Sequence, residues 1–489
     1  MASKLEIQNE KDIHSGAPGY LHDSSTVEIV DQQQQAIDLT DQPIDDRPPR
    51  KFLWLVPLTA HVHPIQFFLY IFSVFVSMAI IVYFATAQSW VIISLLGVPS
   101  SQQGDVTGSL GTYSEVMSVV AVVVWGNLSD RVMKRTVIAI SLVIMGVMVI
   151  VYPYMPTVYP GLLLIRLVYS IGTAGTTCMM AAMMTEVIHG QGGMVSGIIG
   201  ICSGLGAIFA SFVLVDIPVK LVYVAPTTSD TIRYTYVIIG SVTTALGFLL
   251  WRGMPANRFG RRLTFYELVI VRLRDGFSAA RDPRVALGFA SSFFARADEV
   301  IITNFISLWI TQYYIDTGVC SADRVCYAAQ GSTGTLTGIA QSFALISAPF
   351  FGIGSEYLPK EIPLLIAGIV GACGTIPFSF SIDPSSKASM AFIVLTAIGQ
   401  YGMIVSGMAM IGGDFVKPEA RGAVAGAYSF CGAVGIIIVS KVGGVLFDKW
   451  MKGAPFLLLG IGHALIAFFS LVFLVYRVVR WGITKTRRS

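Results

Sequence analysis

The feature that most constrains this chain is the alternation of long apolar segments with short polar turns. Each segment has roughly twenty residues, the length that an α-helix needs to cross a lipid bilayer. Hydrophobic residues make up 54% of the chain and charged residues only 13%, whereas a soluble domain carries about 25% charged residues. Because a segment inside lipid must satisfy its own backbone hydrogen bonds, such segments fold as helices. The sequence therefore predicts an all-α, polytopic membrane protein.

Twelve segments fit this description, so we expect twelve transmembrane helices. Their approximate ranges are 65–88, 105–127, 136–156, 159–185, 193–214, 232–252, 286–313, 333–354, 361–381, 388–412, 421–446 and 454–477. An even number of helices places both ends of the chain on the same side of the membrane. No basic-then-apolar stretch near the start indicates a cleaved signal peptide.

Basic residues tell the two sides apart, because lysine and arginine resist translocation and accumulate in cytoplasmic loops. The loops at 154–158 and 314–332 carry few of them. The other side carries the basic tail after 477 and the arginine-rich loop 252–284, together with Arg131, Lys134, Arg135, Lys360, Lys417 and Arg421. This asymmetry predicts that both termini are cytoplasmic, in the plasma membrane or an endomembrane.

The basic loop in the middle of the chain divides the sequence into two halves. We expect a disordered cytoplasmic tail at 1–64, because low hydrophobicity and acidic residues disfavour a packed core there. The remaining divisions are a six-helix bundle at 65–252, a cytoplasmic linker at 253–285, a second six-helix bundle at 286–477 and a basic cytoplasmic tail at 478–489.

The two halves show signs of an internal repeat. Five residues of the first half match five of the second at one offset: Gly193, Val195, Gly197, Cys202 and Gly206 align with Gly422, Val424, Gly426, Cys431 and Gly435. Glycines at such positions let helix backbones approach closely in lipid. Repeats of this kind are typical of secondary transporters built from two related bundles.

A charged turn, Gly126-Asn-Leu-Ser-Asp130-Arg131-Val-Met133-Lys134-Arg135, separates the second and third apolar segments. It has a fainter copy in the second half, in which Gly352, Glu356 and Lys360 correspond to Gly126, Asp130 and Lys134. A charged hinge between two hydrophobic segments is the expected form of a tight cytoplasmic turn.

This turn resembles the loop 2–3 signature of the major facilitator superfamily, although Met133 stands where a second glycine is usual. With the twelve segments and the repeat, the region from about 60 to 480 resembles a transporter of that superfamily. The resemblance implies two pseudo-symmetric six-helix bundles and a cytoplasmic gate, in which Asp130 meets the helix that starts near Arg421 and Arg131 pairs across the gate. The implied gate residues are Gly126, Asp130, Arg131, Lys134, Arg135, Gly352 and Glu356.

Arg166 and Gly172 in the fourth segment resemble the superfamily's Arg-x-x-x-x-x-Gly signature, with Ser170 where a glycine is more usual. The resemblance implies that Arg166 takes part in proton coupling or substrate contact. The Gly-Pro signature of proton-driven drug antiporters is missing from the fifth segment, which reads Gly200-Ile-Cys-Ser-Gly-Leu-Gly206. A multidrug-efflux function is therefore less favoured.

Charged residues inside apolar segments are costly and need a partner or a function. The densest group lies in the seventh segment, where Arg296, Glu299 and Thr303 fall on one helical stripe with Ser292 and Ser307. Arg296 and Glu299 are three residues apart and could pair, while Asp298 points elsewhere and needs a partner on another helix. Three interpretations stay open: a structural ion pair, a site for a charged solute or a proton, or a cluster at the cytoplasmic interface.

Further candidates for substrate contact or proton coupling are Asn304 and Glu115. Glu115 has no partner within one turn, and Arg166 is the nearest expected cation if both face a cavity. His463 is interpreted as a packing residue.

Four of the six cysteines lie in apolar segments and are interpreted as small buried hydrophobic residues. Cys320 and Cys326 lie in a polar loop, and they could form a disulfide if that loop is extracellular or lumenal. No metal-ligand spacing appears, so we expect neither a metal nor another cofactor.

These observations predict secondary active or facilitative transport of a small organic solute by alternating access, as a symporter or uniporter, with protons as a candidate coupling ion. Arg166 and Arg296 slightly favour an organic anion. The alternative is a transporter-like receptor or scaffold that senses a solute or binds partners without net transport. An enzyme is not expected, and neither ATP-driven transport nor nucleic-acid binding has a supporting motif. We expect a monomer in the lipid bilayer.

Overall fold

The structure is a computed structural model, and it describes residues 51–52, 56–58, 62–129, 132–187, 192–255, 272–321, 325–412, 416 and 421–486. The chain divides into two units, of which Pro49–Ser489 contains every described residue. Residues 1–50 of the tail expected at 1–64, residues 256–271 of the linker expected at 253–285, and the gate residues Asp130 and Arg131 lie outside the described residues. The end of that expected tail contains two short strands and the first residue of a helix.

The first half begins with two short antiparallel strands, β1 (Lys51–Phe52) and β2 (Val56–Pro57). Its helices follow: α2 (Pro64–Trp90), η1 (Val91–Leu95), α3 (Gln103–Ser129), α4 (Lys134–Val151), η2 (Tyr152–Tyr154), η3 (Val158–Leu162), α5 (Leu163–Val187), α6 (Gly192–Phe209), η4 (Ala210–Leu214), α7 (Ile217–Leu221) and α8 (Thr228–Gly253). The first long helix, α2, starts at a capping box: the His63 side chain accepts from the amide of Ile65 at 3.4 Å, and Gln66 accepts from the amide of His63 at 3.1 Å. These bonds satisfy amides that a helix start would leave unpaired.

The second half starts with short helices and continues with long ones. They are α9 (Arg272–Ser278), η6 (Ala279–Arg281), α10 (Pro283–Asp316), α11 (Tyr327–Tyr357), α12 (Glu361–Ser379), α13 (Lys387–Ile411), α14 (Arg421–Lys449) and α15 (Ala454–Thr486). Helix α10 starts at Pro283, directly after Asp282, whose side chain accepts from the amide of Arg284 at 2.9 Å. An acidic cap followed by proline is a strong helix start.

Eleven helices in the described part of the chain are long and apolar enough to cross a membrane. The long helix that is not among them, α10, has 34 residues and carries Arg296, Asp298 and Glu299 near its middle. With α10 the set has the twelve members expected from the sequence, and the prediction of an all-α polytopic membrane protein is confirmed.

Two helices are longer than their apolar segments predicted. Helix α11 starts at Tyr327 rather than near 333, and α15 continues to Thr486 rather than ending near 477. The added first turn of α11 contains Gln330, which is buried inside the protein. A polar residue that faces protein instead of lipid can lie within a transmembrane helix. It still lowers the local hydropathy, so the apolar segment appears to start later than the helix does.

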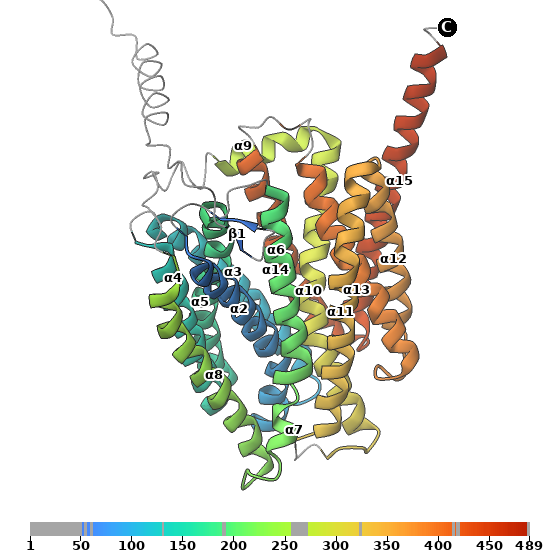
Figure 1. Cartoon of the computed structure of the whole chain (residues 1–489). Coiled ribbons are helices and arrows are strands. Elements are labelled where there is room, and N and C mark those ends of the chain that lie inside the picture. Colours follow the sequence, from blue (N-terminus) through green and yellow to red (C-terminus); the bar gives the residue numbers. More distant parts are fainter. Residues whose placement is uncertain are drawn as a thin grey trace, which may run out of the picture. The chain divides into compact units, whose positions relative to one another are not determined.

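The helices of each half pack together, and the most extensive contacts between the halves join α3 with α14, α6 with α11, and α2 with α10 (Figure 1). We call the end of the helices where Gly126 and Gly352 lie the motif end, and the end where Gln103 and Cys320 lie the opposite end. Helix α9 lies at the motif end and α7 at the opposite end (Figure 1).

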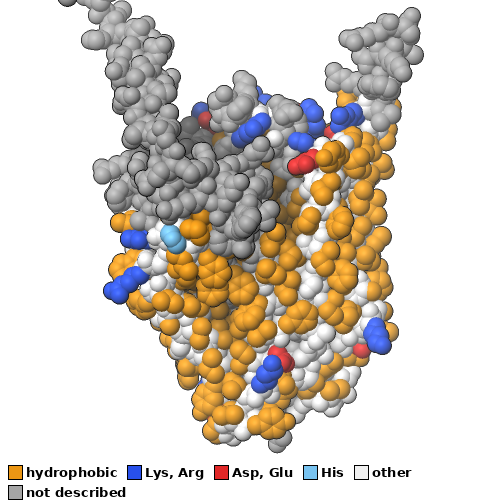
Figure 2. Space-filling model, viewed as in Figure 1, with side chains coloured by type: hydrophobic (Ala, Val, Ile, Leu, Met, Phe, Trp, Pro, Cys, Tyr) orange, Lys and Arg blue, Asp and Glu red, His pale blue; other side chains and the backbone are white. Residues whose placement is uncertain are grey.

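The outer surface agrees with a membrane environment. Figure 2 shows one face on which hydrophobic side chains form a broad band, with lysine, arginine and acidic side chains gathered toward its two ends. Large apolar residues with exposed side chains include Phe350, Phe468 and Leu465. A continuous apolar surface of this kind is stable in lipid and not in water.

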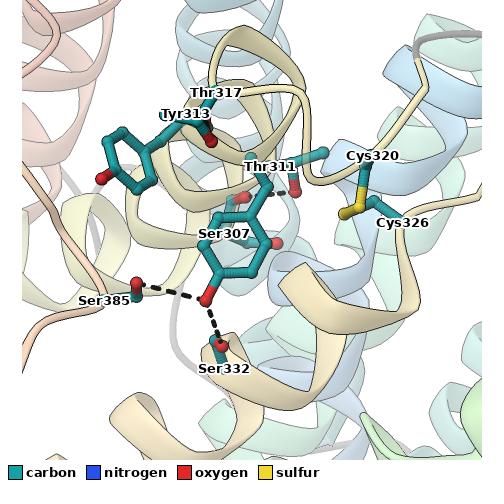
Figure 3. Close-up of a disulfide and its surroundings, with 9 residues drawn as sticks. Ser307, Thr311, Tyr313, Thr317, Cys320, Cys326, Ser332 and Ser385 are labelled. Atoms are coloured by element: carbon teal, nitrogen blue, oxygen red, sulfur yellow. Dashed lines mark hydrogen bonds between the residues drawn. A yellow bond between two sulfur atoms is a disulfide. The ribbon is translucent and has the colours of Figure 1, made fainter.

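The loop after α10 is closed by a disulfide between Cys320 and Cys326 (Figure 3). Beside it, the Tyr314 hydroxyl lies 2.8 Å from the Ser332 hydroxyl of α11 and donates to the Ser385 hydroxyl at 3.2 Å. At the opposite end of the helices, these contacts tie α10 to α11 and to the segment just before α13.

Candidate functional site

A cavity of about 1000 Å³ lies between the two halves. Its walls come from α2, α3, α5 and α6 on one side and from α10, α13 and α14 on the other. At the motif end it is lined by Gly126, Leu273 and Gly422, whereas its deepest lining residues, Gly111 and Ile436, lie near the middle of their helices. The cavity therefore runs from mid-helix toward the motif end.

The halves are closed together at the opposite end. The Ser89 and Ser307 hydroxyls are 2.6 Å apart, and the Gln312 amide donates to Gln103 at 2.5 Å. Near the start of α3, a Cβ on Gly108 would lie 2.2 Å from the backbone oxygen of Ser440 on α14. Only glycine allows so close an approach of two helices.

Charged groups reinforce this closure. Asp448 at the end of α14 accepts from the amides of Gly104 and Asp105 at 2.9 and 2.7 Å, and so caps the start of α3. Lys441 pairs with Asp105 at 2.6 Å. A carboxylate at a helix start satisfies otherwise unpaired amides and interacts favourably with the helix dipole. The structure thus represents a state that is closed at the opposite end and has its cavity toward the motif end.

Among the described residues that line the cavity, four are charged: Glu115 on α3, Arg166 on α5, and Arg296 and Glu299 on α10. Each half contributes one arginine and one glutamate. The two charges of α10 lie three residues apart on the cavity-facing stripe that the sequence predicts. No ion pair within 4.0 Å joins any of the four to another described residue, so the Arg296–Glu299 pair, one of the interpretations that the sequence left open, is not formed in this state.

Arg166 is mostly buried at the cavity wall, with only 8% of its surface exposed. Its Nε donates to the Ser114 hydroxyl at 2.9 Å, and its guanidinium lies 4.9 Å from the centre of the Phe84 ring. Its Nη1 has no hydrogen-bond partner among the described residues. The positive charge is held by a hydroxyl and an aromatic face, and this Nη1 is itself buried.

Glu115 lies within electrostatic range of Arg296 and Glu299, across the boundary between the halves. The sequence suggested Arg166 as its partner, but Arg166 bonds to the neighbouring Ser114 instead. The reason is helical geometry, because adjacent residues on α3 point about 100° apart. Arg296 is exposed to the cavity, and its stem packs on Gly432, where a Cβ would lie 2.6 Å from the Arg296 Cγ.

The rest of the predicted stripe on α10 has three different environments. Thr303 and Asn304 line the cavity, and the Thr303 hydroxyl donates to the Glu299 carbonyl at 2.8 Å. Ser292 instead donates to the Tyr428 carbonyl of α14 at 2.8 Å, and Ser307 meets Ser89 at the closed end. Only the middle of the stripe faces the cavity, because α10 is longer than the cavity is deep.

Asp298 lies outside the cavity lining and has no exposed surface. Its Oδ2 is 2.9 Å from Nε2 of His463 on α15, which is also fully buried. The histidine ring sits in a notch, since a Cβ on Gly371 of α12 would lie 2.1 Å from His463 Nδ1. The sequence indicated a partner on another helix for Asp298, but it treated His463 as packing. The missed signal is that a buried acid and a lone buried histidine in two apolar segments are candidates to lie within ion-pair distance of each other.

The described part of the gate motif makes contacts within the first half. Lys134 donates to the Ala182 carbonyl of α5 at 3.2 Å, and Arg135 donates to the Met254 carbonyl after α8 at 3.5 Å. In the second half, Glu356 is exposed, and a Cβ on Gly352 would lie 4.0 Å from the Val405 side chain.

Two bundles around a charged central cavity that extends toward one end define a membrane transporter. The family model described as Major Facilitator Superfamily matches residues 65–440, and the chain belongs to this superfamily. The prediction made from the charged turn and the repeat is thus confirmed. Members of the superfamily bind small-molecule solutes within a membrane.

Individual relatives match shorter stretches. The chain is 32% identical over 190 residues to magnetosome protein MamH of Paramagnetospirillum magneticum, which is 39% of this chain and 43% of that protein. It is 32% identical over 119 residues to the human synaptic vesicular amine transporter, which is 24% of this chain and 22% of that protein. The chain thus covers less than half the length of these curated relatives.

Among solved structures, a mutant of the nucleoside transporter NupG aligns with 83% of this chain and 99% of its own, at a TM-score of 0.63 and 16% identity. At that identity the likeness shows a shared fold.

Proposed function

We propose that this protein moves a small organic solute across a membrane by alternating access. The observation that carries the proposal is the charged cavity of about 1000 Å³, which is closed at the opposite end and extends toward the motif end. In the second state of the cycle the two bundles of residues 65–252 and 286–477 rock about this cavity. The cavity then opens at the opposite end and closes at the motif end.

The solute carries an anionic group that binds Arg166. A buried guanidinium without a carboxylate partner favours an anion, and the Nη1 of Arg166 has no hydrogen-bond partner among the described residues. The slight preference for an organic anion therefore rests on Arg166 more than on Arg296, which has Glu115 and Glu299 nearby.

Glu115 and Glu299 are the groups through which protons couple to transport. Both line the cavity, where water and protons reach them from the motif end. Asp298 is a weaker candidate in this structure because it is buried away from the cavity and already paired with His463.

The motif end faces the cytoplasm in this proposal. Its support is the positive-inside rule, since Lys134, Arg135, Arg252, Lys360 and Arg477 all lie at that end. The turn that contains Asp130 and Arg131 then forms the cytoplasmic gate with the start of α14 once the halves close there.

The direct test is uptake by the purified protein in lipid vesicles, using a panel of radiolabelled organic solutes at two external pH values. We expect at least one solute to accumulate with a pH-dependent rate, and Glu299→Gln to remove most of that pH dependence while uptake continues. Asp216→Asn serves as a control, because Asp216 pairs with Lys220 at an exposed site outside the cavity.

A receptor would bind a solute of the panel without moving it into the vesicles, and that result would contradict the transport proposal. Uptake with unchanged pH dependence in Glu299→Gln and in Glu115→Gln would keep transport and reject proton coupling through these two residues.

A further inference from the structure

The charges of the cavity are divided unevenly between two places. Arg166 stands with Ser114 and the Phe84 ring, and no carboxylate of the described residues lies within 4.0 Å of it. Arg296 shares its surroundings with two carboxylates, those of Glu115 and Glu299, which lie on both sides of the boundary between the halves. The Arg166 place therefore has a net charge of +1 and the Glu115–Arg296–Glu299 place a net charge of −1 when both glutamates are ionised.

We propose that the cavity selects a zwitterionic solute, whose anionic group binds Arg166 and whose cationic group binds between Glu115 and Glu299. This inference rests on the proposed function of the cavity and names the chemical class of its ligand. An ion of one sign would satisfy one place and leave the other unpaired. Leaving a charge unpaired in a site removed from water is costly.

The total charge of the cavity supports this assignment. The four charged lining residues sum to zero, so a ligand without net charge enters without creating a net charge in the middle of the membrane. Transfer of net charge into a low-dielectric region carries the larger desolvation cost. The Arg166 place lies in the first half, on α5, whereas the other place spans both halves, with Glu115 on α3 and Glu299 on α10. A ligand that binds both places therefore contacts both bundles at once.

The test compares binding of matched small molecules to the purified full-length protein in lipid nanodiscs by isothermal titration calorimetry. One series is L-phenylalanine, 3-phenylpropionate and phenethylamine, which share a skeleton and differ in charge. A second series with a longer spacing is 6-aminohexanoate, hexanoate and hexylamine. We expect the zwitterion of at least one series to bind about tenfold or more tighter than both of its singly charged analogues, because each added charge-assisted contact is worth that factor.

Two variants make the assignment specific. Arg166→Gln should weaken the zwitterion and the anion about tenfold or more and leave the amine unchanged. Glu115→Gln/Glu299→Gln should weaken the zwitterion and the amine, and it should strengthen the anion because Arg296 loses both neighbouring carboxylates. The matched control is Arg233→Gln, since Arg233 also lies over an aromatic ring, that of Tyr154 at 5.8 Å, but outside the cavity.

Folding is checked by the melting temperature of each variant, and Arg166→Lys, which keeps the charge, should recover part of the anion affinity. The inference is overturned if in both series an analogue of one charge binds as tightly as the zwitterion, or if the two cavity variants affect all three probes equally. Zwitterion binding without uptake would contradict transport while supporting this assignment. Uptake of a singly charged solute by a protein that does not bind zwitterions would support transport and contradict the assignment.

Discussion

Replacing Gly108 with alanine is expected to drive the protein out of the state described here. The added Cβ would lie 2.2 Å from the backbone oxygen of Ser440, and it would also approach the Cα of Gly444. Backbone atoms of two packed helices cannot move aside as a side-chain tip can, so α3 and α14 must separate at the opposite end. Overpacking of this kind costs about 1–3 kcal/mol, which changes the ratio of two states by roughly 5- to 150-fold.

The measurement is a distance distribution across the motif end by pulsed electron paramagnetic resonance. Spin labels at Leu128→Cys on α3 and Tyr357→Cys on α11 occupy exposed positions in different halves, in a background whose four free cysteines are replaced by alanine. If the halves rock, the population with a short distance between these labels should rise in Gly108→Ala, because opening at one end accompanies closing at the other.

Gly197→Ala is the matched control. It makes the same chemical change in a membrane helix, but the new Cβ meets no atom within 4 Å. Alanine there should leave the distances unchanged and slightly favour the helix, since glycine is about 1 kcal/mol worse than alanine in helix interiors. Identical distance distributions in the two variants would reject the contact between α3 and α14 as a determinant of state.

Removing one partner of the Asp298–His463 pair is expected to destabilise the protein severely. Both side chains are fully buried on different helices, 2.9 Å apart. Asp298→Ala or His463→Leu alone leaves the other group buried without its partner, at a cost of about 3–5 kcal/mol. The expected readout is a large drop in the melting temperature of the detergent-purified protein, or loss of its monodisperse elution profile.

The double variant Asp298→Ala/His463→Leu should be more stable than either single variant. Replacing a buried pair by apolar groups removes the desolvation cost together with the attraction, and the outcome is often near neutral. Asp216→Ala, which breaks a pair with the exposed Lys220, should change stability by less than about 1 kcal/mol. A double variant that loses as much stability as the two single variants combined would show that the two residues act independently.

The double variant also separates two roles for Asp298. If the pair only positions α10 against α15, the folded double variant should transport with an unaltered pH profile. If the double variant has normal stability but its transport no longer depends on pH, proton coupling would be assigned to Asp298 instead of Glu115 and Glu299.

Hydropathy located the helices well because lipid imposes a strong and simple requirement on every spanning segment. It failed at the start of α11, where Gln330 and its neighbours face protein rather than lipid. It also assigned α10 correctly although that helix carries three charges near its middle, because apolar residues continue on both sides of them, such as Phe293 and Phe294 before and Ile301 and Ile302 after.

The sequence by itself determined the class of this protein. The length of the apolar segments reflects bilayer thickness, and the charge asymmetry of the loops reflects the cost of translocating charge. The paired turns at Gly126 and Gly352 reflect an internal repeat. Each of these features depends on residues that are close together in the sequence. Only the tertiary structure decided which charges meet. Arg166 contacts Ser114 rather than Glu115, Glu115 lies near Arg296 and Glu299, and Asp298 pairs with His463. Such partners lie up to 184 residues apart in the chain, as Glu115 and Glu299 do. The rotation of each helix about its axis, set by packing, determines which of them face each other.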